Sequence, residues 1–575
     1  MTPETATGPR ARVDAASAYR RPAPPALVTL SLDGNEGARP DLDPLLAAIR
    51  DGGPELLRRY PDTAALEALL AGLHGVAPSR VVVTAGADEA IDRCCRAYLA
   101  PGRSLLTADP TFEMLERYAS LAGGRLVDVP WRPGPFPTDA VLARLDASVA
   151  IVAVVSPNNP TGEVASLEDV TRIAAAAPHA LVLLDHAYVE YADQDLTAAA
   201  LAWPNVVVTR TLSKAWGLAG CRVGFALGAV PIIDVLRAAG GPYPVAAPSL
   251  AVAAAQLEHG APVMEAHVAR VRRERAGLTA LLETRGMAPR RSQANFVYAD
   301  LGPRAGFVCD ALASRGVRVR DFPDRPSAAT ALRITLPGDA GGFAQLTAAL
   351  DLALAPDALL LDLDGVLADV AGSYRACIAA TAGAFGVTIT PDDILRMTLA
   401  GDANNDWVLT QRLLAARGVA RSLEDITACF QSHYLGSPGR PGLRETERAI
   451  VSRRTLEALA ARLPLAIVTG RPRAEAEWFL AHAGLEGVAR TLVAMEDAPL
   501  KPDPAPVRLA MQRLGAARGW MVGDTPDDMR AARAAGALAF GVAAPGQAPD
   551  VVGPALREAG AALLLHDLPS LEALW

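Results

Sequence analysis

The sequence lacks the features that mark secreted, membrane-spanning or nucleic-acid-binding proteins. Its six cysteines are scattered and none forms a Cys-x-x-Cys pair, so neither a zinc knuckle nor a disulfide framework is indicated. No apolar run reaches the ~18 residues of a spanning helix, and the first two dozen residues lack the apolar centre of a signal peptide. The 55 basic and 63 acidic residues give a net charge of −8, which does not favour nucleic-acid binding. We therefore expect a soluble, cytoplasmic protein with reduced thiols that binds neither nucleic acid nor membrane.

The length and composition instead predict a globular protein of two or more domains. The chain has 575 residues, beyond the ~250–300 at which one hydrophobic core stops growing, and 51% of them are hydrophobic. Short apolar runs alternate with helical stretches, which is typical of a mostly parallel sheet covered on both faces. The runs form a first series at 81–84, 104–107, 149–155, 181–184 and 206–209, and a second at 358–361, 465–468, 520–522 and 539–542.

The division of the chain follows from the gap between these two series. A helix at about 341–354 ends the first series, and a new apolar strand begins at Ala358. We expect one domain over residues 26–355 and another over residues 356–575. The segment 1–25 is rich in Ala, Pro, Arg and Thr, and we expect it to be disordered.

A lysine-containing loop, RTLSKAWGLAGCR at residues 210–222, is the strongest signal in the first half. A lone lysine is usually a solvated surface charge, but companion motifs accompany this one in chain order. They are LDGNEG, RYPD, GADEAID, DPTFEM, SPNNPTG, LLDHAY, SQANF, GVRVRDF and LRIT. From about Leu32 to Leu336, the set resembles the fold-type I aminotransferases, and specifically the histidinol-phosphate aminotransferase group. The resemblance implies an α/β fold with a large and a small domain, pyridoxal 5'-phosphate as cofactor, and a homodimer.

The resemblance assigns the cofactor ring to five residues. Lys214 matches the Schiff-base lysine, which can move a proton at the substrate α-carbon once substrate displaces it. Asp185 matches the carboxylate that keeps the pyridine nitrogen protonated, so that the ring can act as an electron sink. Asn159 and Tyr188 match the groups that bind the ring hydroxyl. Phe112 matches the aromatic side chain that stacks on the ring.

The cofactor phosphate has its own predicted cradle. Free amides at the start of a helix expected over 89–99 suit a dianion, and hydroxyl and guanidinium groups add donors. The residues that the resemblance places there are Ala87, Asp88, Thr211, Ser213 and Arg222. Tyr60 matches a tyrosine that reaches the phosphate from the neighbouring subunit, which implies an active site shared within a dimer.

Two arginines are the candidate substrate-binding residues. Arg333 matches the arginine that binds the acidic end of the substrate, and Arg320 matches one that binds the substrate phosphate in the histidinol-phosphate group. A surface ion pair is the alternative for Arg320. The sequence departs from the family where His186 stands in place of the usual Glu, and where Leu-Pro-Gly-Asp follows Thr335.

A pair of aspartates carries the chemistry of the second half. Asp362 and Asp364 follow an apolar strand, and residues at i and i+2 on an extended segment share a face. A divalent cation and a phosphoryl substrate would neutralise such a pair, whereas the alternative is a helix-capping role. With LDLDGVLAD, VTGRP, LKPDP and VGDTPDDM, the chain from about Ala358 to Ala543 resembles the haloacid-dehalogenase superfamily. The resemblance makes Asp362 the nucleophile and Asp364 the general acid and base.

The remaining motifs of the second half also follow predicted strands, at the sheet edge where ligands bind in open α/β folds. Thr469 matches the hydroxyl that binds phosphoryl oxygens, and Lys501 matches the lysine that orients the nucleophile. The resemblance implies a Mg²⁺ site formed by Asp362, Asp364, Asp524 and Asp528.

A helical insertion is expected within the second domain, at about 370–455. Its clearest amphipathic stretches are Trp407–Arg417 and Thr446–Ala461. They match the helical cap of one branch of the superfamily, a subgroup of which is found fused to aminotransferase-like domains. The loop Gly401–Trp407 lies in this insertion and either contacts substrate or caps the following helix.

The two resemblances together predict a bifunctional enzyme. Its substrates would be a small amino donor and acceptor and a phosphate monoester, and the lead hypothesis joins transamination of an amino acid or phosphorylated amino alcohol to hydrolysis of the ester. A decarboxylase of the threonine-phosphate type, fused to the phosphatase, is one alternative. Others are a non-catalytic C-terminal module for regulation or dimerisation, and an enzyme with a different amine acceptor.

Overall fold

The computed structural model describes residues 28–575, so the expectation for residues 1–25 lies outside the described residues. The described chain divides into two compact units. Unit 1 contains the residues up to Ala305 and Arg318–Gln345, and unit 2 contains Gly306–Val317 and Leu346–Trp575. Within 28–575, no helix has the length and apolarity needed to cross a membrane.

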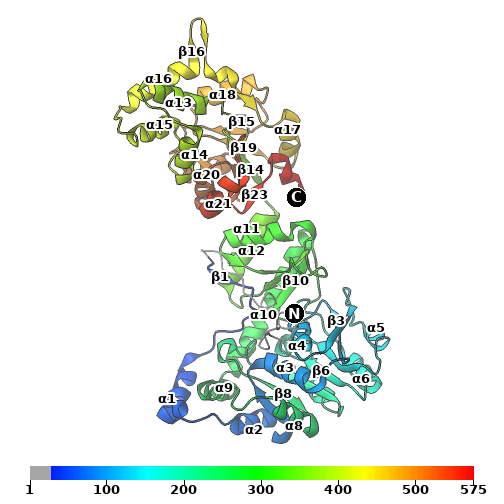
Figure 1. Ribbon diagram of the computed structural model, residues 1–575. Coiled ribbons are helices and arrows are strands. Elements are labelled where there is room, and N and C mark those ends of the chain that lie inside the picture. The colour runs from blue at the N-terminus through cyan, green and yellow to red at the C-terminus, as the bar shows by residue number, and fades with distance from the viewer. Residues whose placement is uncertain (1–27) are drawn as a thin grey trace, which may run out of the picture. The chain divides into compact units, whose positions relative to one another are not determined.

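Unit 1 is built on a seven-stranded sheet with helices on both faces (Figure 1). Only β8 runs against its neighbours, so the predicted mostly parallel sheet is confirmed. The strands, in spatial order, are β2 (Val81–Thr84), β8 (Gly224–Gly228), β7 (Val206–Thr211), β6 (Leu181–Asp185), β5 (Val149–Val155), β3 (Ser104–Asp109) and β4 (Arg125–Pro130). The strand β5 is apolar and buried throughout, as expected for a strand covered on both faces.

The helices of unit 1 connect and cover these strands. Helix α9 is alanine-rich, and about half of its residues are buried. The helices are α1 (Leu42–Arg58), α2 (Ala64–Leu73), α3 (Gly86–Tyr98), α4 (Met114–Leu121), α5 (Thr138–Leu142), α6 (Leu167–Ala176), α7 (Thr197–Ala200), α8 (Val230–Ala239), α9 (Ala247–His259) and α10 (Ala261–Thr284).

A smaller antiparallel sheet follows α10. Its strands, in spatial order, are β12 (Arg320–Asp321), β13 (Ala331–Thr335), β10 (Phe296–Asp300) and β9 (Ala288–Pro289). The two candidate substrate arginines lie on it, and Arg320 pairs directly with Arg333 across β12 and β13. The remaining elements before residue 356 are the short strands β1 (Leu30–Ser31) and β11 (Val317–Arg318) and the helices α11 (Ala305–Ser314) and α12 (Ala340–Leu354). Of these, α11 from Gly306 and α12 from Leu346 belong to unit 2.

Unit 2 contains a six-stranded sheet in which all strands are parallel. The strands, in spatial order, are β20 (Thr491–Val493), β19 (Leu465–Val468), β14 (Ala358–Leu361), β21 (Gly519–Gly523), β22 (Leu538–Val542) and β23 (Leu563–Leu565). Five helices accompany this sheet: α17 (Arg453–Arg462), α18 (Arg473–His482), α19 (Ala505–Leu514), α20 (Pro526–Ala535) and α21 (Pro549–Ala559).

A mostly helical insertion leaves unit 2 after β15 (Ala368–Asp369) and returns at β18 (Arg448–Ala449), and these two strands pair with each other. Its elements are α13 (Tyr374–Ala384), α14 (Pro391–Ala400), α15 (Asp406–Ala415), α16 (Leu423–Leu435), β16 (Gly436–Ser437) and β17 (Arg440–Pro441). The fold class predicted from the sequence, two α/β domains with a helical insertion in the second, is confirmed.

One predicted helix is wrong at its start. The amphipathic pattern of Thr446–Ala461 predicts a helix over the whole stretch, but α17 begins only at Arg453. There, the Ser452 hydroxyl accepts a hydrogen bond from the Thr455 amide. Before it, the chain forms β18 and turns the carboxylate of Glu447 into the interior. A buried ion pair therefore decides the backbone here, which an amphipathic pattern does not reveal.

Candidate active sites

A cavity of about 640 Å³ lies in unit 1, where residues from the large sheet, its loops and the small sheet meet. Such a volume is typical of a small-molecule site. Of the residues expected to bind the cofactor, those that line it are Ala87, Asp88, Phe112, Asn159, Asp185, Tyr188, Thr211, Ser213, Lys214 and Arg222. Arg320 and Arg333 line the same cavity. The structure thus brings together residues that are as much as 246 positions apart in the chain.

Lys214 and Asp185 lie on this cavity. The Lys214 ammonium donates a hydrogen bond to the Gly34 carbonyl at 3.2 Å and lies 5.6 Å from the centre of the Tyr188 ring. Asp185 ends β6, and its carboxylate accepts from the Thr209 hydroxyl at 3.1 Å. Burial raises the pKa of Asp185 to about 7. A buried carboxylate of this kind suits a cationic ligand.

An anion cradle forms at the start of α3. The helix begins at Gly86, whose φ of +81° favours glycine. A side chain at Gly224, on β8, would come within 2.4–2.7 Å of the backbone at Gly86 and Ala87, so this close approach requires glycine. The Arg222 guanidinium donates to Ser213 Oγ at 3.2 Å and to Asp88 at 3.0 Å. Free amides, hydroxyls and a guanidinium therefore converge here.

These residues fit pyridoxal 5'-phosphate. The amides at the start of α3, with Ser213 and Arg222, would hold the phosphate, and the buried Asp185 would face the ring nitrogen. Lys214 would reach the carbonyl carbon. When bound, the cofactor supplies an electron sink for the substrate α-carbon.

The substrate arginines differ in their surroundings. Arg333 is 7% exposed, and its guanidinium donates to Asn159 Oδ1 at 2.6 Å and to the Asp33 carbonyl at 2.5 Å. Burial lowers its pKa. Arg320 is less buried and lies 3.8 Å from the Glu113 carboxylate. A free carboxylate ligand could replace either contact.

Two further cavity residues were not assigned a role from the sequence. Arg325 donates to the Thr111 carbonyl at 2.7 Å and to Asp109 at 3.2 Å, and no motif surrounds it. Asn35 is buried, and its amide donates to the Tyr188 hydroxyl at 2.9 Å. The motif LDGNEG contains Asn35 and could have revealed it.

Tyr60 is the predicted cofactor residue that does not line this cavity. Its side chain is 80% exposed and stacks on Tyr243, with ring centres 4.5 Å apart. Tyr60 therefore does not reach the predicted phosphate site of its own chain. Its predicted contact with the phosphate bound by a second copy of the chain stays a prediction.

Three carboxylates form a cluster at the ends of β14 and β21 in unit 2. One oxygen from each of Asp362, Asp524 and Asp528 lies within 4.8 Å of the others, and all three residues are buried. Lys501 lies 2.7 Å from Asp362 and 2.5 Å from Asp528. Burial raises the pKa of Asp362 to about 7, against the opposing charge of Lys501.

The cluster fits a hard divalent cation such as Mg²⁺. The Asp524 Oδ1 atom is buried without a hydrogen-bond partner, and burial with neighbouring carboxylates raises the pKa of this group well above its usual range. Oxygen ligands of this charge are those that Mg²⁺ prefers. The aspartates would hold the ion, which would offset the charge of a phosphoryl group. Thr469 lies nearby at the end of β19, where its hydroxyl accepts from the Arg471 amide at 3.1 Å.

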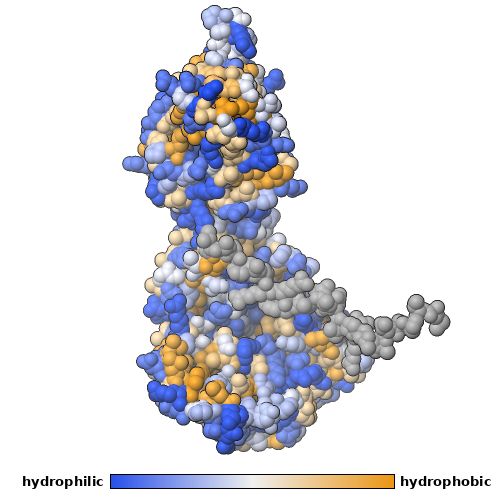
Figure 2. Space-filling view, turned by 60° about the vertical axis from the view of Figure 1, so that its left-hand side comes forward, coloured by the Kyte–Doolittle hydropathy of each residue, from blue (hydrophilic) through white to orange (hydrophobic). Residues whose placement is uncertain are grey.

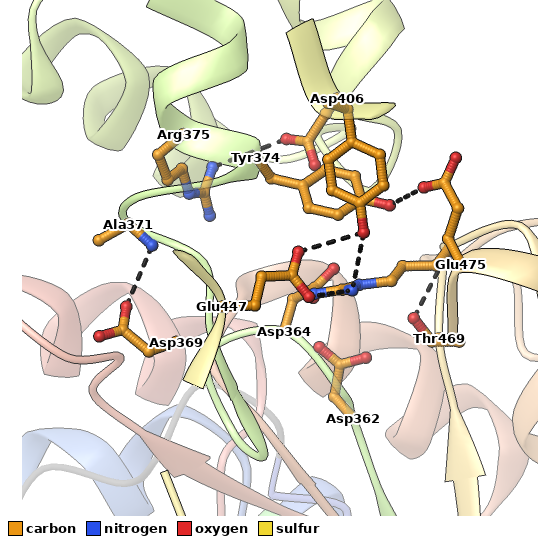
Figure 3. Close-up of polar contacts among 12 residues, drawn as sticks. Asp362, Asp364, Asp369, Ala371, Tyr374, Arg375, Asp406, Glu447, Thr469 and Glu475 are labelled. Carbon is orange, nitrogen blue, oxygen red and sulfur yellow. Dashed lines mark hydrogen bonds and ion pairs between the residues drawn. The ribbon is translucent and has the colours of Figure 1, made fainter. Parts of the chain in front are cut away.

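Asp364 is a neighbour of this cluster but is not one of its three carboxylates. The Arg471 Nε and Nη2 atoms lie 2.7 and 2.5 Å from Asp364 Oδ1, and Figure 3 shows Asp364 on the side of Glu447 and Tyr374. The Asp364 carboxylate pairs with Arg471, and its expected part in the metal site stays a prediction. Arg471 itself was not singled out in the sequence, although it stands in the VTGRP motif.

Comparison with known proteins identifies both units. A family model for "Aminotransferase class I and II" matches residues 32–350, and one for "haloacid dehalogenase-like hydrolase" matches residues 356–536. The chain belongs to the class I and II aminotransferase family. It also carries a haloacid dehalogenase-like hydrolase domain, so the two resemblances seen in the sequence are confirmed.

Individual relatives agree with this assignment. Histidinol-phosphate aminotransferase of Dinoroseobacter shibae is 36% identical over 320 residues, which cover 54% of this chain and 88% of that protein. The solved histidinol-phosphate aminotransferase of Sinorhizobium meliloti, in complex with pyridoxal-5'-phosphate, is 26% identical with a TM-score of 0.51, covering 56% of this chain and 90% of that one. Imidazoleglycerol-phosphate dehydratase of Phytophthora nicotianae is 43% identical over 224 residues, 36% of this chain, so the chain spans about half (50%) of that relative.

Proposed function

We propose that this aminotransferase-hydrolase chain carries out two reactions. Its first domain, over 26–355, transaminates an amino acid or a phosphorylated amino alcohol of the histidinol-phosphate kind with pyridoxal 5'-phosphate. Its second domain, over 356–575, hydrolyses a phosphate monoester with Mg²⁺. We further propose that the ester is the substrate or product of the first domain, so that the two steps are consecutive.

One observation supports this proposal: in each unit, residues that the proposal assigns to its reaction lie close together. In unit 1, Lys214 shares a cavity with Arg320 and Arg333. In unit 2, Lys501 binds the nucleophile Asp362 beside a cluster of carboxylates. A degenerate domain would not be expected to keep these buried charges, because each is costly without its partners.

In unit 1, the residues bind substrate and move one proton. Arg333 holds the acidic end of the substrate, which is a carboxylate in an amino acid, and Arg320 holds the phosphate of a phosphorylated amino alcohol or a second acidic group. Lys214 is the only lysine on the cavity wall, so its amine is the base that takes the α-proton and returns it. The buried Asp185 keeps a positive charge at the ring nitrogen.

In unit 2, the residues transfer a phosphoryl group twice. An oxygen of Asp362 attacks phosphorus, the bond from phosphorus to the ester oxygen breaks, and Asp364 gives a proton to the departing oxygen. Asp364 then takes a proton from water, whose oxygen attacks phosphorus and releases Asp362 together with inorganic phosphate. Lys501 and Thr469 offset and bind the phosphoryl charge, which is the main requirement of such a transfer.

A homodimer through unit 1 is part of the proposal. The α1 helix exposes Leu42, Leu46 and Leu57, and Tyr60 follows it. The space-filling view shows apolar side chains gathered over the lower part of the visible face (Figure 2). Exposed apolar surface of this kind favours association. Tyr60 would then reach the phosphate site of the second copy.

Decarboxylation of a threonine-phosphate-type substrate is the second candidate reaction. It would use the same lysine and the same arginines, so the cavity by itself supports both. The 36% identity to a histidinol-phosphate aminotransferase favours transamination. A non-catalytic second domain is disfavoured by the intact set of Asp362, Lys501 and Asp524.

The test is incubation of the purified protein with histidinol phosphate, 2-oxoglutarate and Mg²⁺, with glutamate and free phosphate measured in parallel. We expect both to form, and phosphate release to stop when Mg²⁺ is chelated. Release of carbon dioxide from threonine phosphate, without glutamate, would favour the decarboxylase. Neither product from any phosphorylated amine would refute the consecutive steps.

A further inference from the structure

Arg471 occupies an unusual position beside the phosphoryl site of unit 2. Its side chain is only 1% exposed. A guanidinium group is rarely buried to this extent unless it has charged or polar partners. It follows Thr469 by two residues and so belongs to the loop after β19. The rings of Tyr374 and Phe479 lie 4.5 and 5.4 Å from its guanidinium carbon. The plane of the guanidinium is therefore held in place by packing as well as by charge.

The polar partners of Arg471 come from two different parts of unit 2. Its Nε and Nη2 atoms contact Oδ1 of Asp364 at 2.7 and 2.5 Å. Its Nη1 atom donates to Glu447 at 2.8 Å, and Glu447 is also bound by the Tyr434 hydroxyl at 3.2 Å. Glu447 directly precedes β18, where the helical insertion returns to the sheet. Arg471 thus joins the aspartate to the base of the insertion.

These contacts leave one oxygen of Asp364 available. Both contacts from Arg471 involve Oδ1, and the Asp364 side chain is 26% exposed. A small cavity of about 20 Å³ adjoins it, with room for about one water molecule. Asn404, Asp406 and Trp407, all from the insertion, line this cavity together with Asp364. Oδ2 is therefore the oxygen that can face a departing group on the insertion side.

We propose that Arg471 is a positioning residue, which holds Asp364 by one oxygen so that the other exchanges its proton with the leaving group. Glu447 fixes Arg471 and makes this geometry depend on the insertion being in place. The inference rests on the proposed phosphatase function. It assigns to Arg471 no contact with phosphorus, so it predicts an effect on proton transfer and not on nucleophilic attack.

The dependence of the rate on the leaving group separates an effect on proton transfer from an effect on nucleophilic attack. An alkoxide leaves only if it is protonated, whereas p-nitrophenolate leaves as a stable anion and needs no general acid. The experiment compares kcat/KM for glycerol 2-phosphate and p-nitrophenyl phosphate in the full chain with Mg²⁺. For Arg471→Lys, we expect a loss of at least about tenfold on the alkyl ester, mostly in kcat, and of less than about threefold on the aryl ester.

A double-mutant cycle tests whether Arg471 acts through Asp364. In an Asp364→Asn background, Arg471→Lys should cause no further loss on the alkyl ester. Arg473, which pairs with Asp497 outside this network, provides the matched control, and Arg473→Lys should change neither activity. If Arg471→Lys does not fold, the neutral pair Arg471→Met with Glu447→Gln removes both buried charges and should show the same selective loss.

The outcomes distinguish the inference from the function on which it rests. Equal losses on both esters, or a further loss in the Asp364→Asn background, would overturn the role of Arg471 and leave the phosphatase assignment intact. A wild-type protein that hydrolyses neither ester would overturn the phosphatase function itself.

Discussion

Replacement of His186 by Asn should make unit 1 less sensitive to acid. The imidazole is 2% exposed, and its Nδ1 atom lies 3.2 Å from the Thr197 hydroxyl. Burial, followed by the charge of Arg210, lowers the pKa of His186 to about 3. An unfolded histidine has a pKa of about 6.5, so between these values the unfolded chain binds a proton that the folded chain does not. The resulting stability is complete above about pH 6.5 and is lost as the pH falls toward 3.

The size of the effect follows from this interval. From pH 7 to pH 5, the free energy of unfolding should fall by about 2 kcal/mol through His186, at about 1.4 kcal/mol per pKa unit. Asn cannot take up the proton, so the free energy of unfolding of His186→Asn should fall by about 2 kcal/mol less than that of the wild type over the same pH interval. This difference corresponds to a few degrees in Tm.

Thermal unfolding of the cofactor-loaded protein can be monitored through release of the cofactor, and this signal reports on unit 1 alone. His259 is exposed, and His259→Asn serves as the control that should keep the wild-type pH dependence. Comparing each protein with itself at two pH values removes the constant cost of the smaller side chain. An equal pH dependence in wild type, His186→Asn and His259→Asn would refute the argument.

Three further predictions concern the two sites. Lys214→Ala should abolish trapping of the cofactor by borohydride, measured as mass added to the protein; an adduct that survives would contradict the assignment of this lysine. Asp362→Asn should remove Mg²⁺-dependent phosphate release and leave glutamate formation within about twofold, because the groups of each reaction lie within separate units. Loss of both activities in a folded protein would argue for one composite site. Arg320→Ala should lower kcat/KM about ten- to a hundredfold for a phosphorylated amino donor, since a charged hydrogen bond contributes about 1.5–3 kcal/mol, and should change little for a non-phosphorylated one. Equal losses on the two donors would indicate a structural role.

The apolar strands were the most predictable part of the fold. The runs at 81–84, 149–155, 358–361 and 465–468 coincide with β2, β5, β14 and β19. Strands buried on both faces must be apolar throughout, so they are visible without knowledge of the tertiary structure. The same holds for the chemistry that follows them, since the carboxyl ends of neighbouring parallel strands meet at one edge.

Residues that act through distant partners were less predictable. Arg325 lies in no motif, and the VTGRP motif that contains Arg471 does not reveal its partner, because Asp109 and Glu447 are brought close to these arginines only by the fold. Ion pairs between residues that are far apart in the chain leave no periodic signal in a sequence. The short strand β18 was missed for the same reason, since its place is determined by Glu447 and by pairing with β15.

The extent of unit 2 illustrates the same limit at the scale of helices. The family matches end at residue 350 and resume at residue 356, which gives no reason to expect earlier residues in the second unit. Yet unit 2 also contains 306–317 and 346–355. Phe307 packs against Trp520 and Phe540, with ring centres 5.5 and 5.8 Å apart, and the Trp520 indole donates to the Leu352 carbonyl at 2.8 Å. An alternation of strands and helices reveals where the strands begin. It does not reveal which helix packs against which sheet, because this packing depends on contacts between large side chains that are far apart in the chain. A fragment starting at residue 356 would lack Phe307 and would expose the faces of Trp520 and Phe540 against which it packs.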